Sequence, residues 1–124
     1  MKYTNEQKIG YALREIGIHQ DLKGYQYLKM AILGVLEKPD MLDRMVKDIY
    51  PYVAKKFNTN SSCVERAIRH AIETSWLDTD DEIIHLVFGN SISKDTGRPT
   101  NSHFIFAIAE IITDYEEHAL LPKG

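Results

Sequence analysis

Apolar residues recur at intervals of three and four along most of this chain, which is the spacing that places side chains on one face of an α-helix. The pattern predicts helical segments over 3–16, 24–38, 40–49, 51–57, 61–77, 81–88 and 100–118, with a polar loop over 90–99. No segment alternates between apolar and polar residues for long, so strands are not expected. We therefore predict an all-α fold with about six helices in one bundle.

Residues with special backbone preferences mark the predicted helix ends. Gly17 and Pro39 follow helical segments at places where helices commonly stop. Pro51 suits the first turn of a helix, since its missing N–H needs no partner there. Asn60 or Ser61 is expected to cap the segment that follows. These signals divide the apolar pattern into separate helices.

The segments that meet at Asn58 have the features of a helix-turn-helix over about residues 50–77. Two helices that cross closely need a small residue at the crossing, and Ala54 meets that need. The turn needs a residue that tolerates positive φ, which Asn58 does more readily than most residues. The sequence therefore predicts a recognition helix over 61–77.

The predicted recognition helix has one polar face. With Val64, Ala67, Ile68 and Ala71 turned inward, the outward residues are Ser62, Cys63, Glu65, Arg66, Arg69, His70 and Glu73. Arg66 can present two parallel donors to guanine in a major groove. Phosphate contacts, which fix register without reading bases, suit Arg69, His70, Lys55 and Lys56. The same face also allows solvated intrahelical pairs between Glu65 and the two arginines.

Charge is distributed unevenly along the chain. The net charge is −3 overall, but it is +1 over residues 1–40, +2 over 41–77 and −6 over 78–124. DNA phosphates repel an acidic segment, so an anion-binding surface is expected in the middle segment. The overall charge argues against a non-specific nucleic-acid coat protein.

Length and composition narrow the class of protein. A chain of 124 residues with 44% hydrophobic and 27% charged residues suits one soluble globular domain over 1–124. No apolar run approaches a membrane span, and no signal-peptide pattern opens the chain, so we expect a cytoplasmic protein without membrane contact. The single cysteine, Cys63, allows no internal disulfide.

Catalytic and metal-binding patterns are weak. The five histidines do not pair at the spacing that places two ligands on one helical face. The acidic run over 78–82 lacks the glycine and the distal glutamate of a calcium loop, and the glycines lack phosphate-loop spacing. We predict no enzyme activity, no cofactor and no metal site.

Three separate stretches, in the right order, resemble one known family. Residues 55–59 and 64–73, with Trp76 behind them, resemble the recognition region of the C-terminal effector domain of sporulation stage 0 protein A, a response regulator that starts endospore formation. Residues 23–28 with 31–32 resemble the start of that domain's second helix, and 88–89, 97–102 and 104–105 resemble its closing loop and last helix. The resemblance runs from about Ile9 to Ile112, which is nearly the whole chain.

The resemblance implies a six-helix bundle with an embedded helix-turn-helix that binds double-stranded DNA at short promoter boxes of the TGTCGAA type. The family binds such boxes as head-to-tail pairs, self-associating on DNA, and contacts the RNA polymerase sigma subunit. By position, Glu65 and Arg66 correspond to base-reading residues, and Arg69, His70 and Arg98 to phosphate-contacting residues. The segment over 81–88 is expected near the sigma and partner contacts.

Two departures from the family pattern change these expectations. The position of Cys63 is usually arginine, and a good bidentate arginine contact contributes about 1–3 kcal/mol of base discrimination. We therefore expect weaker binding to the family's box, or a preference for another box. The phosphorylated N-terminal receiver domain of the family has no counterpart in these residues, so we expect either an excised effector domain or a stand-alone relative.

A second hypothesis is a helical protein-interaction module. The acidic segment over 78–124 would then dominate, and the chain would pair with a full-length regulator or RNA polymerase without reading DNA. Retention on heparin at low salt distinguishes the hypotheses, because a localised basic face is retained and an acidic module is not.

Overall fold

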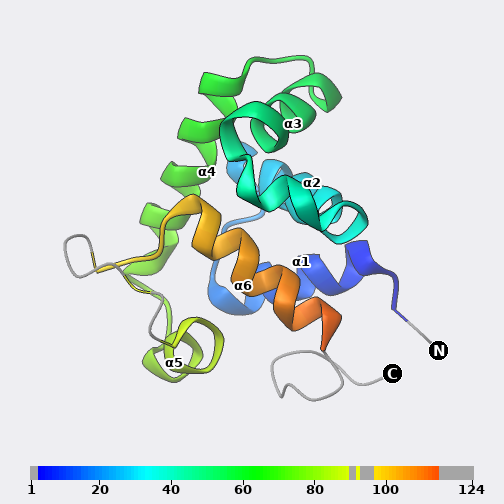
Figure 1. Cartoon of the computed structure of the whole chain (residues 1–124). Coiled ribbons are helices and arrows are strands. Elements are labelled where there is room, and N and C mark those ends of the chain that lie inside the picture. The colour runs from blue at the N-terminus through cyan, green and yellow to red at the C-terminus, as the bar shows by residue number, and fades with distance from the viewer. Residues whose placement is uncertain (1–2, 90–91, 93–96, 115–124) are drawn as a thin grey trace.

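The computed structural model describes residues 3–89, 92 and 97–114, and over these residues it contains helices and no strand (Figure 1). The α-helices are α1 (Asn5–Ile16), α2 (Lys23–Glu37), α3 (Tyr50–Lys56), α4 (Ser61–Trp76), α5 (Asp81–Phe88) and α6 (Asn101–Thr113). The predicted all-α fold is confirmed.

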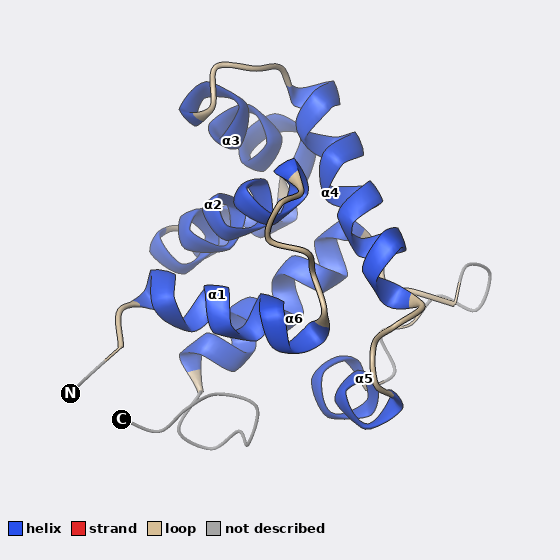
Figure 2. Cartoon of the chain, turned by 180° about the vertical axis from the view of Figure 1, so that it is seen from behind, coloured by secondary structure: helices blue, strands red, loops and turns tan. Residues whose placement is uncertain are grey.

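Helix α2 lies at the centre of the packing, in contact with α1, α3, α4 and α6. Both views place α2 between α1 and α3, with α4 along one side and α5 at one end (Figure 1, Figure 2). The core is formed by the apolar faces that the helical spacing predicts. Its largest fully buried side chains include Ile9, Leu13, Leu28, Ile32, Val53, Ile68, Ile72, Phe104, Ile105 and Ile108.

Several predicted helix ends are confirmed by local geometry. The start of α1 differs, since the helix was predicted from residue 3 and begins at Asn5, after a capping box in which the Thr4 hydroxyl accepts from the Gln7 N–H and the Gln7 side chain accepts from the Thr4 N–H. Gly17 ends α1 at φ 108°, a conformation that favours glycine. Pro51 lies in the first turn of α3, as its missing N–H requires.

The prediction of an α-helix over 40–49 is wrong. A 3₁₀ turn over Pro39–Asp43 is followed by a wide π turn over Met45–Ile49, and the non-helical backbone of Arg44 separates the two. Val46, which the prediction places on an apolar face, is 74% exposed.

The cause of the wide turn lies in the chain that follows it. The Tyr50 N–H donates to the Met45 carbonyl, five residues back, in place of the usual four. Pro51 has no N–H to offer the carbonyl four residues before it, so the α-helical bonding pattern is interrupted here. The π turn then leads directly into α3, because Ile49 already has helical φ and ψ.

The end of α4 agrees with the prediction, and the end of α6 does not. Helix α4 ends at Trp76 with Leu77 as its C-cap, and Leu77 is 91% exposed. Helix α6 stops at Thr113, because Asp114 has φ −111° and ψ 28°. The predicted continuation over 115–118 and most of the predicted loop over 90–99 lie outside the described residues.

Gly24, at the start of α2, allows α2 and α4 to approach closely. A Cβ at this position would overlap the Ala67 carbonyl oxygen of α4 and lie 2.6 Å from the Ala71 Cβ. Backbone atoms cannot move aside as the end of a flexible side chain can. The packing of α4 on α2 therefore requires glycine here.

We predict that Gly24→Ala destabilises the fold, because its Cβ must push α4 away from α2. Overpacking of this kind typically costs about 1–3 kcal/mol. Chemical denaturation measures the change in unfolding free energy. Gly10→Ala is the matched control, since a Cβ there meets the ends of the Arg14 and Tyr25 side chains at 3.0 and 3.1 Å. Equal stability of the two variants would contradict the packing argument.

Candidate nucleic-acid interface

The helix-turn-helix is formed by α3 and α4. Asn58 adopts φ 54°, as predicted, and the Thr59 N–H donates to the Ala54 carbonyl at 2.9 Å. The Asn60 side-chain oxygen caps α4 by accepting from the Cys63 N–H at 2.9 Å. Ala54 is 5% exposed, so the small residue predicted at the helix crossing is buried. The turn and the cap therefore fix where α4 begins.

The two faces of α4 differ as the spacing predicts. Val64, Ile68, Ala71 and Ile72 are buried, while Ala67 is half-buried against α2. Among the predicted site residues, the exposed ones are Ser62, Arg66, Arg69, His70, Lys55 and Lys56, and the half-buried ones are Cys63, Glu65 and Arg98. The structure thus places the predicted residues of α4 along its exposed side.

Glu73 joins Arg69 and Arg98 into an ion-pair chain that continues from Arg69 to Glu65. Arg69 pairs with Glu65, and its Nε lies 3.7 Å from a Glu73 oxygen. Arg98 Nη2 lies 3.2 Å from the same Glu73 oxygen. The chain Glu65, Arg69, Glu73 and Arg98 alternates in charge, so the intrahelical pairs considered from the sequence are present for Arg69.

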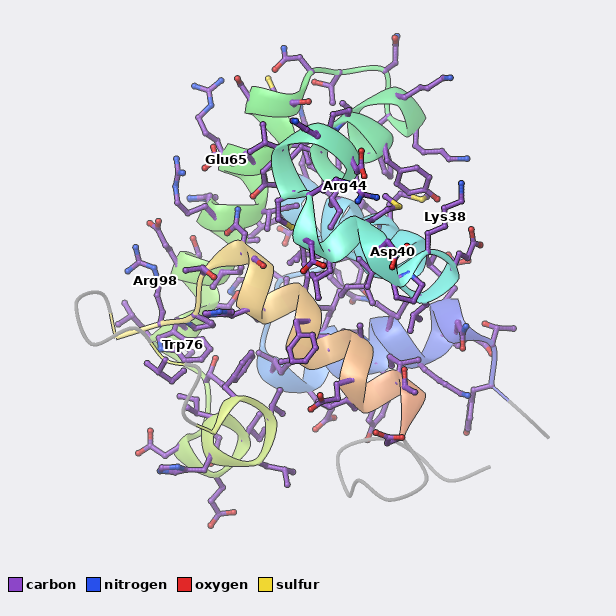
Figure 3. All side chains as sticks on the ribbon, viewed as in Figure 1. Lys38, Asp40, Arg44, Glu65, Trp76 and Arg98 are labelled. Carbon is purple, nitrogen blue, oxygen red and sulfur yellow. The ribbon has the colours of Figure 1, made fainter. Side chains whose placement is uncertain are left out.

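Arg98 reaches α4 because the segment that carries it is anchored on Trp76. The Trp76 indole N–H donates to the Gly97 carbonyl at 2.8 Å, and Gly97 turns the backbone at φ 72°. Pro99 then enters the protein interior. Figure 3 shows Arg98 and Trp76 close together at the C-terminal end of α4, with Glu65 nearer its start. Glu73 and Trp76 thus position Arg98.

Asn101 is a positioning residue that the sequence did not indicate. Its side-chain N–H₂ donates to the Tyr50 hydroxyl at 3.0 Å and to the Glu65 backbone carbonyl at 3.2 Å. These bonds connect α6 with α3 and α4. Burial raises the pKa of Tyr50, while the Asn101 hydrogen bond acts in the opposite direction. Only the folded structure brings these residues together, so no local sequence signal identifies Asn101.

An open cavity of about 350 Å³ lies where α3, α4 and the start of α6 meet. Its lining includes the guanidinium-bearing residues Arg69 and Arg98 and the carboxylate-bearing Glu65, together with Tyr50, Asn101 and Ser102. Guanidinium groups offer planar sets of donors that match phosphate oxygens. The cavity therefore brings two guanidinium groups and one carboxylate together at the edge of α4.

Arg66 lies along the first turns of α4. Its Nε donates to the Ser62 carbonyl at 3.3 Å, and its Nη2 lies 4.0 Å from the Cys63 sulfur. A hydrogen bond from Thr59 lowers the pKa of the Cys63 thiol, and Arg66 lowers it further. The exposed guanidinium of Arg66 and the thiol of Cys63 thus lie next to each other at the N-terminal end of α4.

Within 3–89, 92 and 97–114, no three His, Cys, Asp or Glu side chains are grouped so that they hold a metal ion. Across that part of the chain, no helix combines the length and apolar character of a membrane span.

The sequence pattern of the family described as "Sporulation initiation factor Spo0A C terminal" matches residues 9–112, nearly the whole chain. The chain belongs to this family. Spo0A C-terminal domains are the DNA-binding effector domains of a response regulator and regulate transcription in sporulation, and they are not an enzyme family. The polar face of α4 therefore lies on the helix-turn-helix of a DNA-binding domain.

We predict that Thr59→Val raises the pKa of Cys63, because it removes the largest cause of the lowered value. The pH dependence of iodoacetamide alkylation measures this pKa, since the thiolate is the reacting form. Thr59→Ser keeps the hydroxyl and should keep the original midpoint. A midpoint that is the same in all three proteins would show that Thr59 does not act on the thiol.

Proposed function

We propose that this domain regulates sporulation genes by inserting the N-terminal half of α4 into the major groove of promoter boxes of the TGTCGAA type, as head-to-tail pairs. The observation that carries the proposal is the single exposed polar stripe of α4, on a family helix-turn-helix whose inner face is buried. Major-groove edges distinguish all four base pairs, and an α-helix fits that groove.

Base contacts are assigned to the first turns of α4. Ser62, Cys63, Glu65 and Arg66 are closest to the capped start of the helix, the end that enters the groove in a helix-turn-helix. The exposed guanidinium of Arg66 is suited to the O6 and N7 acceptors of guanine. Glu65 can accept from a cytosine amino group when it exchanges its pairing with Arg69.

Phosphate contacts are assigned to residues around this centre. Arg69 and Arg98 line the cavity between α3, α4 and α6, which supports a shared phosphate contact there. His70 is exposed farther along α4. Lys55 and Lys56 are exposed at the end of α3, on the other side of the turn. Such contacts fix the register of the helix on the duplex.

Helix α5 is assigned to protein partners, namely the RNA polymerase sigma subunit and a second copy of the domain on tandem boxes. Its N-terminus carries Asp81 and Glu82, and Leu86 is 49% exposed on its surface. An acidic end beside an exposed apolar side chain suits protein contact better than phosphate contact.

Fluorescence anisotropy tests the proposal with a labelled duplex carrying two tandem boxes, a scrambled duplex and a salt series. A specific regulator should prefer the boxes by roughly a thousandfold or more. Equal, weak and steeply salt-dependent binding to both duplexes would contradict the proposed box.

A protein-interaction module is the second candidate function. It is favoured by the acidic charge of residues 78–124, by the exposed Leu86 within that segment and by the exposed Leu77 directly before it. Heparin retention at low salt separates the two functions, because the module would not be retained. Strong retention supports the DNA-binding function.

We predict that Arg66→Ala removes the preference for the box, whereas Arg69→Ala weakens binding to boxed and scrambled duplexes alike. Arg66→Ala loses a bidentate base contact worth about 1–3 kcal/mol, and Arg69→Ala loses a phosphate contact that reads no base. Anisotropy on both duplexes measures the difference. Lys29→Ala is the control, because it removes a positive charge outside the helix-turn-helix. Lys29 lies on α2, and its side chain pairs with Glu6 of α1 at 3.3 Å. Equal losses on both duplexes for Arg66→Ala would refute the assigned roles.

We also predict that Cys63→Arg tightens binding to the family's box about tenfold or more, because it supplies a second base-reading guanidinium. Competition with the scrambled duplex checks that the gain is specific. Cys63→Lys is the matched control, since it adds the same charge without the bidentate geometry. No gain for Cys63→Arg would mean that this position does not face a base.

A further inference from the structure

Glu73 occupies an unusual position for a residue on a DNA-binding face. Its carboxylate touches two guanidinium groups that the proposed function directs to phosphates, Arg69 at 3.7 Å and Arg98 at 3.2 Å. A carboxylate repels phosphate and competes with it for the same donors. Glu73 therefore opposes the contacts that its neighbours are placed to make.

The ion pairs around Glu73 are partly exposed to solvent, so a phosphate can exchange with the carboxylate. The side chains of Glu73, Arg69 and Arg98 are 40%, 48% and 32% exposed. Ion pairs at such exposure contribute little to stability, because water screens them. A phosphate can therefore displace the carboxylate from either arginine without disturbing the fold.

The surroundings keep Arg98 within reach of Glu73. The Trp76 bond to the Gly97 carbonyl and the burial of Pro99 hold the backbone on both sides of Arg98. Glu65 holds Arg69 from the other side, so the ion-pair chain is nearly neutral overall. Without the charge of Glu73, the four side chains Glu65, Arg69, Glu73 and Arg98 would together carry a net charge of +1 in place of 0.

We propose that Glu73 restrains the sequence-independent affinity of this domain for DNA, by holding Arg69 and Arg98 in ion pairs that phosphates must displace. The inference rests on the proposed function and adds a residue that limits binding. Non-specific affinity comes almost entirely from phosphate neutralisation, so a carboxylate among the cations lowers it directly. Base reading by Arg66 does not depend on Glu73.

Glu73→Gln tests the proposal, because it keeps the shape of the side chain and removes its charge. On a scrambled duplex we expect binding about tenfold tighter at 0.1 M salt, which is the effect of one additional charge in the counterion-release relation. The slope of log K against log salt should steepen by roughly 0.9. Thermal unfolding should change little, since the pairs are exposed.

Two further variants separate a local effect from overall charge. Glu110→Gln makes the same change of charge at an exposed position near the end of α6 and should leave scrambled-duplex binding nearly unchanged. In an Arg98→Gln background, the gain from Glu73→Gln should shrink, because one of the two held guanidiniums is gone. Equal gains from Glu73→Gln and Glu110→Gln would overturn the proposal, as would no gain from Glu73→Gln.

The scrambled duplex keeps this test distinct from the test of box reading. A wild-type protein without box preference would refute the proposed box, while the Glu73→Gln gain on scrambled DNA would still support the restraint. If the wild-type protein strongly prefers the boxes, and Glu73→Gln binds scrambled DNA no more tightly than the wild type, only the proposed restraint is overturned. Absence of any DNA or heparin binding by both proteins would overturn both.

Discussion

The close approach of α2 and α4 at Gly24 is the contact on which the rest of the structure depends. The backbone of α4 at Ala67 and the Cβ of Ala71 occupy the space that a larger residue would need. This contact uses the inner face of α4 and leaves its opposite face outward. A recognition helix must present side chains in a fixed direction, and a rigid support for one face provides that direction.

Helix α4 is also held by the segment that leads into α6 and by the first residue of α6. Asn101 bonds to the Glu65 carbonyl, and Trp76 bonds to the Gly97 carbonyl. These contacts come from far along the chain and place Arg98 against α4. The proposed DNA-binding surface is therefore assembled from a helix, a turn and a segment distant in sequence, and the carboxylates of Glu65 and Glu73 lie among its cations.

Sequence periodicity predicted the helical class, the turn at Asn58 and the two faces of α4, because these features depend on residues close in sequence. The predicted 40–49 α-helix was wrong because the backbone of Arg44 is not helical and separates a 3₁₀ turn from a π turn, a change of geometry that apolar spacing alone does not reveal. The bonds of Asn101 and the pairing of Arg98 with Glu73 depend on packing between distant segments, which spacing along the chain does not encode.

Backbone amide NMR tests directly whether the outer face of α4 meets DNA. A duplex with a single box is titrated into the isotope-labelled domain, and the amide signals are followed. We expect shifts concentrated at residues 62–70, with smaller shifts at 55–56 and at Arg98. A single box avoids contacts between copies, so signals over 81–88 should stay in place. Shifts confined to 81–88, with residues 62–70 unchanged, would contradict the account.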